Sequence, residues 1–356
     1  MSRIVVIGAG MVGRGLIGEL FATAGWDVHF LDVAQVVIAT LAQDGGYRHI
    51  VVGNDGESET WVGHVTASLS TDANAVDHVV AADLVATAVG ANVLPRLAGL
   101  LVDAQRRRPD RPVNVLLCEN LHDADKVLRE AVVAIDADAG AQLGLVRTSI
   151  GRMIPVTAPG EPTTEVRVEA YGFLPVDAAA MRSPVPLPRR VIVDPSVPFS
   201  FYADRKLYVH NMGHFLAGLL GATRGEKYLW QAMESAEVRE IVQAAMTQSA
   251  AALAQHYHQP VGPLLLHAED LRERFRNRAL GDTIDRVVRD PQRKLADGDR
   301  VQGALALCAE EGVAAPHITL AAQLGRAYAA GELWTSDQVS AALASLRREM
   351  LSQPVV

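Results

Sequence analysis

The sequence predicts an α/β fold, with an N-terminal doubly wound parallel sheet and a C-terminal, mostly α-helical domain. Apolar strand-like runs alternate with helical patterns through about the first 150 residues, which is typical of such a sheet. Strand patterns nearly vanish after residue 200, and a proline-rich segment separates the two regions. Because 356 residues are too many for one ordinary core, we expect two domains, residues 1–199 and 200–356.

A βαβ unit is expected at the N-terminus. Residues 3–8 form an apolar run typical of a buried parallel strand, and a helical pattern of apolar residues follows as far as Phe21. Residues 27–31 give a second strand that ends at Asp32, and a helix is expected over 33–41. The later strands of the sheet are predicted at 83–89, 113–118 and 143–148, with helices at 93–106 and 121–133.

Two segments depart from this alternation. Residues 46–69 alternate apolar and polar side chains around a Gly-Asn-Asp-Gly turn, which indicates a hairpin inserted between strands of the sheet. Within the proline-rich segment 151–199, Val166 and Val168 suggest one short strand. The second domain is expected to hold helices at residues 203–220, 233–256, 265–277, 298–311, 316–330 and 336–351.

Charge and composition exclude several classes of protein. A net charge of −8 argues against a general nucleic-acid binder and against adsorption to anionic membranes. No apolar run approaches the roughly 20 residues that span a bilayer, and no signal peptide precedes the first strand. Cys118 and Cys308 are too far apart for a zinc motif or a disulfide framework. We therefore expect a cytoplasmic monomer or small homo-oligomer without nucleic-acid, membrane or metal partners.

The turn between the first strand and the first helix carries the pattern Gly-x-Gly-x-x-Gly. The first glycine permits a tight turn, the second lets a pyrophosphate approach the backbone, and the third lets helix and strand pack closely. Free N–H groups at the start of the helix then face the phosphates. A glycine-rich turn without a ligand is the alternative, but the flanking strand and helix favour the dinucleotide site of a Rossmann domain. The predicted contacts are Gly8, Ala9, Gly10, Met11, Val12 and Gly13.

The identity of the dinucleotide is predicted from Asp32, which follows Gly13 by 19 residues. A carboxylate at this strand end accepts hydrogen bonds from the adenosine ribose and repels a 2′-phosphate, so NAD is favoured over NADP. Acids at strand ends are also common surface residues. Small residues at the end of a later strand would admit the nicotinamide half, with a simple tight turn as the equal alternative. These predicted contacts are Thr87, Val89 and Gly90.

A candidate catalytic cluster lies in residues 205–214, Arg-Lys-Leu-Tyr-Val-His-Asn-Met-Gly-His. At about 100° per helical residue, Lys206, Asn211 and His214 fall near about 0°, 140° and 80° around the axis, and can therefore face one cleft. His210, near about 40°, can join them. A solvated helix face is the alternative. The strongly apolar turns that begin at Phe215 favour the buried end of a core helix instead.

The residue types in this cluster suit the oxidation of an alcohol. Lys206 can remove the hydroxyl proton if desolvation and the positive nicotinamide ring lower its pKa from about 10.4. The amide of Asn211 can donate to the developing alkoxide. Asn120, just past the strand that ends at Cys118, can supply a second donor from the sheet.

With these residues the chain resembles the long-chain polyol dehydrogenases, from its start to about residue 330. The resemblance rests on Gly-Ala-Gly-Met-Val-Gly-Arg-Gly at 8–15, Thr-Ala-Val-Gly at 87–90, Cys-Glu-Asn at 118–120, Arg-Lys-Leu…Asn-x-Gly-His at 205–214 and Arg-Lys-Leu-Ala-x-Gly-Asp-Arg at 293–300. It implies a Rossmann domain, a mostly helical domain and a zinc-independent mechanism. It further implies that Lys206 is the general acid/base, Asn120 and Asn211 form the oxyanion hole, and His214 orients the substrate.

Two features bear on the substrate. The family usually carries an acid, close to its active site, where this chain has Gly151 in Ile-Gly-Arg-Met-Ile-Pro. Among the interleaved charges of residues 272–300, Arg293 and Lys294 are the candidates for binding a substrate phosphate. A solvated and internally paired surface is the alternative for these basic residues.

Together with these residues, the resemblance therefore implies a metal-independent, NAD-dependent hydride transfer between a polyol phosphate and a ketose phosphate. Mannitol 1-phosphate and fructose 6-phosphate are the leading pair. The missing acid at Gly151 motivates an alternative, in which the same chemistry acts on an unphosphorylated polyol, a hexuronate or a cyclitol-like substrate. A non-catalytic NAD-binding regulator is a third possibility, and the intact set of Lys206, Asn211 and His214 argues against it.

Overall fold

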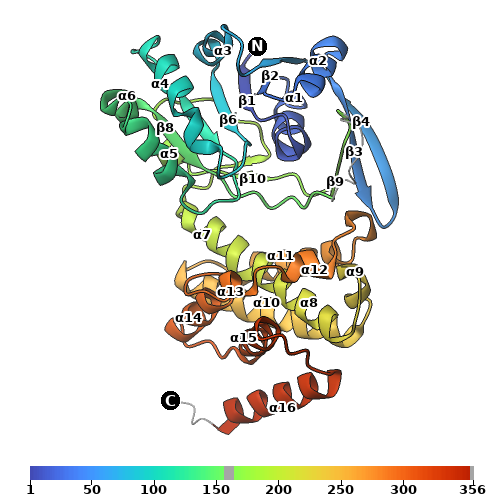
Figure 1. Ribbon diagram of the computed structural model, residues 1–356. Helices are drawn as coiled ribbons and strands as arrows, with labels where there is room; N and C mark the ends of the chain where they lie inside the picture. The colour runs from blue at the N-terminus through green and yellow to red at the C-terminus, as the bar shows by residue number, and fades with distance from the viewer. Residues whose placement is uncertain (156–163, 353–356) are drawn as a thin grey trace. The chain divides into compact units, whose positions relative to one another are not determined.

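The computed structural model describes residues 1–155 and 164–352. The chain divides into two compact units, Met1–Phe199 and Ser200–Val356 (Figure 1). The first contains the strands, and the second is built from helices. No helix among the described residues is both long and apolar enough to cross a membrane.

A six-stranded parallel sheet forms the centre of the first unit. Its strand order is β5-β2-β1-β6-β7-β8, so the chain winds outward from β1 in both directions, as in a Rossmann sheet. This confirms the predicted doubly wound fold. The six strands are β1 (Arg3–Ile7), β2 (Asp27–Asp32), β5 (Val65–Leu69), β6 (Leu84–Thr87), β7 (Asn114–Leu117) and β8 (Gly144–Arg147).

Alternating side chains of β1 enter two separate cores, one on each face of the sheet. Ile4 and Val6 pack with residues of α1 (Glu19–Ala22) and α2 (Gln35–Asp44). Val5 and Ile7 pack on the opposite face, where the helices lie side by side in Figure 1. Those helices are α3 (Ala75–Ala81), α4 (Ala98–Arg106), α5 (Ala124–Val133) and α6 (Ala137–Gln142), with a 3₁₀ turn at Leu94–Leu97. Covering both faces explains why the strands read as continuous apolar runs.

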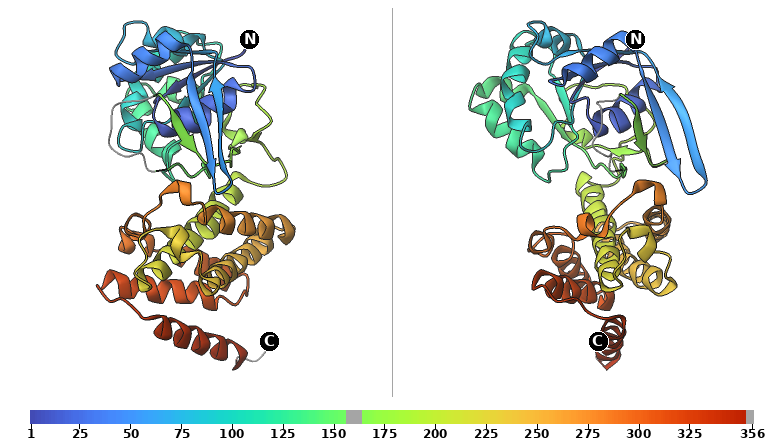
Figure 2. Two further views of the ribbon diagram at one scale, coloured as in Figure 1. Left: turned by 90° about the vertical axis from the view of Figure 1, so that its right-hand side faces the viewer. Right: turned by 45° about the vertical axis from the view of Figure 1, so that its right-hand side comes forward.

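The predicted hairpin is present, but it is shorter than the segment 46–69. β3 (Tyr47–Gly53) and β4 (Gly56–Val62) pair antiparallel and stand out as a long ribbon in Figure 2. With β9 (Val166–Val168) they form a second sheet, in the order β4-β3-β9. Residues 65–69 instead form β5, which pairs in parallel with β2 at the sheet edge. An apolar–polar alternation suits a hairpin strand and an edge strand equally, so the pattern could not separate them.

The second unit is built around one long helical stretch. α7 (Phe199–Asp204), a π-helical turn at Arg205–Asn211 and α8 (Met212–Thr223) follow one another without a break. The apolar residues of α8, including Phe215 and Leu216, are buried on all sides. The surrounding helices are α9 (Leu229–Ala232), α10 (Ala236–His256), α11 (Val261–Phe275), α12 (Ile284–Val288), α13 (Pro291–Lys294), α14 (Gln302–Glu310), α15 (Pro316–Ala329) and α16 (Ser336–Ser352). The long helices match the predicted segments, whereas α9, α12 and α13 were too short to predict.

Candidate active site

The glycines of the turn after β1 each meet a distinct steric demand. Gly8 has φ +108°, and a Cβ there would lie 2.4 Å from the carbonyl oxygen of Ala88. A Cβ on Gly13 would lie 1.9 Å from the carbonyl oxygen of Gly8, so only glycine lets the helix start so close to the strand. Around Gly10, which is exposed, a Cβ would meet no atom within 4 Å. The turn therefore leaves open the position where a pyrophosphate would approach.

The helix after this turn begins in an unusual way. Residues Gly13–Gly18 form a π-helical turn, a feature often found at functional sites. Arg14 within it is buried, and its Nε donates a 2.6 Å hydrogen bond to the carbonyl of Ala9. Burial lowers the pKa of Arg14. Sequence reasoning did not single out Arg14, and its place directly after Gly13 was the only signal available.

Asp32 is fastened to the glycine turn. Its Oδ2 accepts a 2.6 Å hydrogen bond from the backbone N–H of Ala9, and its Oδ1 accepts a 3.0 Å bond from that of Ala34. The side chain stays partly exposed, so its oxygens can also accept from ribose hydroxyls. Met11 and Val12, also predicted contacts, are partly exposed at the helix start.

The ends of β1, β6 and β7 lie level with one another, because Ile7 pairs with Thr87 and Thr87 pairs with Leu117. Gly8, Gly90 and Asn120 therefore follow neighbouring strands at the carboxyl edge of the sheet. In this fold that edge is where ligands bind. Asn120 is exposed there, immediately after β7.

Glu119 ties two of these strand ends together. Its Oε2 accepts a 2.8 Å hydrogen bond from the hydroxyl of Thr87, and its Oε1 accepts a 3.1 Å bond from the N–H of Val89. Burial raises the pKa of Glu119, and these hydrogen bonds oppose that rise only in part. Thr87 is fully buried, and its hydroxyl is used in the hydrogen bond to Glu119. Direct contact between Thr87 and a cofactor stays a prediction. Glu119 was missed because a lone acid beside an asparagine carries no pattern.

Lys206 lies in the second unit, on the π-helical turn. Burial and the nearby positive charge of Arg300 lower its pKa from 10.5 to about 8. Arg300 is held by Asp299, whose carboxylate accepts a 2.9 Å hydrogen bond from its Nε. A lysine with such a pKa exchanges its proton near neutral pH, as a general acid/base requires.

The π-helical turn changes the angles on which the cluster was predicted. Its hydrogen bonds join residues five apart, so Lys206 and Asn211 lie nearly above one another on one face of the helix. An α-helix would have set them about 140° apart. Burial, and after it the positive charge of Arg274, lowers the pKa of His210. The ring of His210 lies 6.3 Å from that of His214, centroid to centroid. The π-helical turn thus brings Lys206 and Asn211 toward one face of the helix, and the catalytic roles of the cluster stay a prediction.

His214 has a carboxylate partner that the sequence did not suggest. Its Nε2 and the Oδ2 of Asp282 are 2.7 Å apart. The other oxygen of Asp282 accepts a 2.8 Å hydrogen bond from the Nε of Arg286. His214 also lies against Phe275, with the ring centroids 5.2 Å apart.

The two candidates for phosphate binding face different surroundings. Lys294 is buried, and its Nζ donates a 2.7 Å hydrogen bond to the carbonyl of Val287. Burial and nearby arginines lower its pKa to about 8. Arg293 is exposed and lies 3.5 Å from Asp299. Each of the two cations thus has a partner within the protein, and their binding of phosphate stays a prediction.

Gly151 lies beside the ring of Tyr171. A Cβ on Gly151 would lie 3.0 Å from Cε1 of that ring, so the ring occupies the space of any larger side chain. The following residue, Arg152, is buried and donates a 2.6 Å hydrogen bond to the carbonyl of Gly15 in the first helix. The segment at Gly151 is therefore packed against the helical turn that follows the glycine turn.

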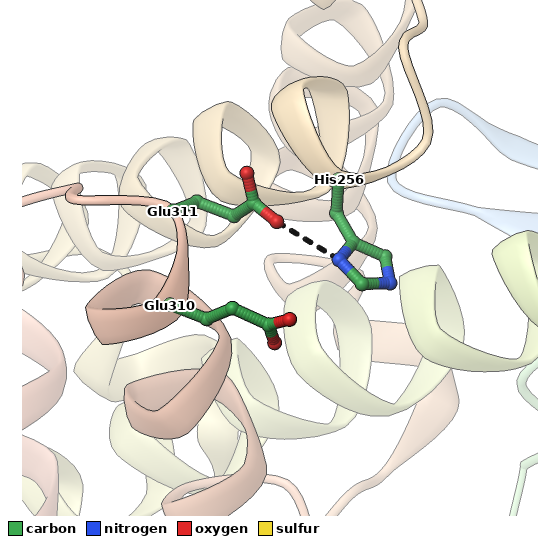
Figure 3. Close-up of side chains that lie close together, drawn as sticks. All are labelled: His256, Glu310 and Glu311. Carbon is green, nitrogen blue, oxygen red and sulfur yellow. Dashed lines mark hydrogen bonds and ion pairs between the residues drawn. The ribbon is translucent and has the colours of Figure 1, made fainter.

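One surface group of side chains has the composition of a metal site. His256, Glu310 and Glu311 bring one possible ligand atom each within 4.8 Å of one another. Figure 3 shows the Nδ1 of His256 joined to Glu311 at 2.9 Å, with the carboxylate of Glu310 on the same side of the ring. His256 and Glu310 are exposed, and the His256–Glu311 contact is a surface ion pair if the ring is protonated.

The fold and the geometry of the glycine turn indicate a class of protein. A dinucleotide turn with an attached acid, on the edge of a doubly wound sheet, belongs to a nicotinamide-dependent oxidoreductase. Comparison with known proteins gives the family. Residues 2–186 match the family described as the mannitol dehydrogenase Rossmann domain, and residues 199–352 match the mannitol dehydrogenase C-terminal domain. The chain belongs to the mannitol dehydrogenase family, which confirms the predicted resemblance. It is an NAD-dependent dehydrogenase that acts on a CH–OH group.

Two curated relatives align over most of the chain. The mannitol-1-phosphate 5-dehydrogenase of Geobacillus thermodenitrificans is 33% identical over 84% of this chain and 79% of its own length. The enzyme of the same name from Brevibacillus brevis is 32% identical over 95% of this chain and 89% of its own length.

Solved structures support the fold. A substrate-free D-sorbitol dehydrogenase superposes with a TM-score of 0.76 at 16% identity, over 90% of this chain and 79% of the other. The Pseudomonas fluorescens mannitol 2-dehydrogenase, in ternary complex with NAD and D-mannitol, gives a TM-score of 0.61 at 16% identity, over 99% and 95% of the two chains.

Proposed function

We propose that this enzyme transfers hydride reversibly between a polyol and NAD without a metal, with Lys206 as general acid/base. The observation that carries the proposal is the burial of Lys206 near Arg300, which lowers its pKa to about 8. At that pKa the amine can exchange a proton at physiological pH. The π-helical turn that sets Asn211 in line with it adds an amide donor on the same face.

The chain's own residues account for the proton and charge movements. When bound at the glycine turn, NAD would supply the hydride acceptor for the alcohol carbon, and NADH the hydride donor for a ketone. During oxidation, neutral Lys206 takes the hydroxyl proton, and the amides of Asn211 and Asn120 donate to the oxygen as negative charge develops. During reduction, protonated Lys206 returns that proton to the forming alkoxide. His214 holds a substrate hydroxyl.

The cofactor is assigned to the glycine turn of the first unit. The open position at Gly10 and the partly exposed carboxylate of Asp32 fit the pyrophosphate and the adenosine ribose of NAD. Gly8 and Gly13 shape the turn, and Val89 and Gly90 follow the neighbouring strand. The proposed NAD contacts are those predicted from the sequence.

For the substrate we propose mannitol 1-phosphate in one direction and fructose 6-phosphate in the other. The support is the name shared by the curated relatives, which align over most of their own length. The specific observation against it is that both candidate cations already have protein partners, since buried Lys294 donates to the carbonyl of Val287 and Arg293 faces Asp299. An unphosphorylated polyol or a hexuronate is therefore the second candidate, and Gly151 in place of an acid also favours it.

The proposal is tested by following NADH consumption over a panel of ketoses, each with and without a phosphate. Fructose 6-phosphate is expected to give a kcat/KM at least about a hundredfold above fructose, because a phosphate gains charge-assisted hydrogen bonds. Activity on unphosphorylated sugars alone would establish the second candidate.

We propose a cytoplasmic location, as a monomer or small homo-oligomer. Size-exclusion chromatography with light scattering measures the oligomeric state.

A further inference from the structure

The pair formed by His214 and Asp282 is enclosed on one side and open on the other. The side chain of Asp282 is only 6% exposed, whereas that of His214 is 19% exposed. The bond between them uses Nε2 of the imidazole and Oδ2 of the carboxylate, 2.7 Å apart. The Nε2 side of the ring thus ends on a buried carboxylate, while the His214 side chain as a whole stays partly exposed.

Asp282 is itself fixed from several directions. Its Oδ1 accepts a hydrogen bond from Nε of Arg286 at 2.8 Å and forms an ion pair with a terminal nitrogen of Arg286 at 2.7 Å. Its backbone carbonyl accepts from the N–H of Leu229 at 2.9 Å. The next residue, Thr283, caps α12 through a hydrogen bond from the N–H of Arg286. A carboxylate so anchored can impose a geometry on its partner.

The charge on this carboxylate decides which nitrogen of His214 carries a proton. Burial alone raises the pKa of Asp282, but the hydrogen bonds from His214 and Arg286 and the positive charge of Arg286 oppose it, and the pKa is lowered. An ionised carboxylate only accepts hydrogen bonds, so Nε2 must be the protonated nitrogen. In the neutral ring, Nδ1 is then an acceptor.

The plane of the imidazole is also fixed. The ring of Phe275 lies at 5.2 Å with an interplanar angle of 55°, and that of His210 lies at 6.3 Å and 79°. Packing on these rings and the bond to Asp282 leave one orientation for His214. Nδ1 is therefore presented in a constant position, on the same helix as Lys206 and Asn211.

We propose that Asp282 is a positioning residue, which holds His214 in its Nε2–H tautomer so that Nδ1 accepts a hydrogen bond from a substrate hydroxyl next to the reacting carbon. The inference rests on the proposed function, because it assigns His214 to substrate. It implies selection for substrates that carry a hydroxyl donor at that point, and against analogues in which the hydroxyl is absent or methylated.

The first test is the tautomer itself. Long-range ¹H–¹⁵N correlation spectra of the wild-type protein with ¹⁵N-labelled histidine, assigned through His214→Gln, are expected to show the Nε2–H form. Finding the Nδ1–H form would overturn the proposal, whatever any variant does.

The second test uses Asp282→Asn. An asparagine keeps its oxygen toward Arg286 and turns its NH₂ toward His214, so Nε2 becomes the acceptor and the proton moves to Nδ1. We expect the KM for substrate to rise about tenfold or more, the loss of one hydrogen bond, with a smaller change in kcat and an unchanged Kd for NADH. The carboxylate variant Asp282→Glu is expected to recover part of the affinity. An unchanged KM in Asp282→Asn would contradict the proposal.

A double-mutant cycle separates positioning from mere stability. In a His214→Ala background, Asp282→Asn should change KM no further, whereas a purely structural role would change it in both backgrounds. The matched control is Glu311→Gln at the surface pair with His256, which should leave KM unaltered (Figure 3). Full activity of Lys206→Ala would refute the proposed function. If Lys206→Ala loses activity, but the effects of Asp282→Asn and His214→Ala on KM are additive, only the role of Asp282 is refuted.

Discussion

The carboxylate of Asp32 accepts a 2.6 Å hydrogen bond from the backbone N–H of Ala9, inside the glycine turn. The acid predicted to bind ribose is thereby part of the turn predicted to bind pyrophosphate. A second hydrogen bond, from the N–H of Ala34, holds the carboxylate from the other side. The two halves of the dinucleotide motif are therefore placed together before any cofactor arrives, which lowers the cost of binding.

Replacing Asp32 by alanine should weaken NADH binding and relax the choice between cofactors. The lost hydrogen bonds to ribose correspond to a rise in the Kd for NADH of roughly 10- to 100-fold. The Kd for NADPH should change much less, since the repulsion of its 2′-phosphate is also lost. Fluorescence titration measures both constants, and Asp44→Ala on the exposed end of α2 is the control. Equal weakening for NADPH would show that Asp32 only stabilises the turn.

The pH dependence of turnover should follow Lys206. Oxidation needs the neutral amine, so its kcat/KM should rise with pH and level off above about pH 8, while reduction needs the ammonium and should decline there. Arg300→Met removes a positive charge that lowers the pKa of Lys206, and should move both inflections to higher pH. Stopped-flow rates in both directions provide the profiles. If the inflections of the Arg300→Met profiles match those of the wild type, the charge of Arg300 does not set the pKa that governs turnover.

Placing an acid at position 151 should disturb the ring of Tyr171. Gly151→Asp puts a Cβ 3.0 Å from that ring, and forcing the two apart should cost about 1–3 kcal/mol of unfolding free energy. In a Tyr171→Ala background the same substitution should cost close to nothing. Urea denaturation of the four proteins measures the coupling. Equal losses in both backgrounds would mean that Tyr171 does not fill the space of the absent acid.

Removal of divalent metals should leave the enzyme active. The proposed proton transfer uses Lys206, and the His256, Glu310 and Glu311 group lies on the surface. After dialysis against EDTA, kcat is expected to match the untreated enzyme within error, and Glu310→Gln should behave as wild type. A loss of kcat that Zn²⁺ restores would require a metal in the mechanism.

The sequence was sufficient for those parts of the molecule in which local pattern and tertiary environment agree. β1 and the glycine turn carry steric demands that only glycine meets, and these demands can be read from spacing. The cores on both faces of the sheet likewise demand continuous apolar strands. The edge strand β5 was misassigned to the hairpin, because a half-covered strand shows the same alternation in both settings.

Long-range partners could not be predicted. Glu119 and Asp282 act through hydrogen bonds to residues 30 or more positions away, and neither belongs to a periodic pattern. The π-helical turn at Arg205–Asn211 was not predicted, because the positions of these residues around the helix were derived from α-helical angles. Arg293 and Lys294 are adjacent in sequence, yet one is exposed and the other buried, since a short helix at the surface sends neighbouring side chains in different directions.

The most direct test of the account is the substitution of Lys206 by alanine, measured as steady-state turnover together with NADH binding by fluorescence. A general acid/base contributes roughly 10²- to 10⁴-fold to the rate, so kcat should fall by at least that lower factor. The Kd for NADH should match that of the wild type, because the proposed cofactor contacts belong to the first unit. Turnover at the wild-type rate would contradict the assignment of Lys206 and the proposed function built on it.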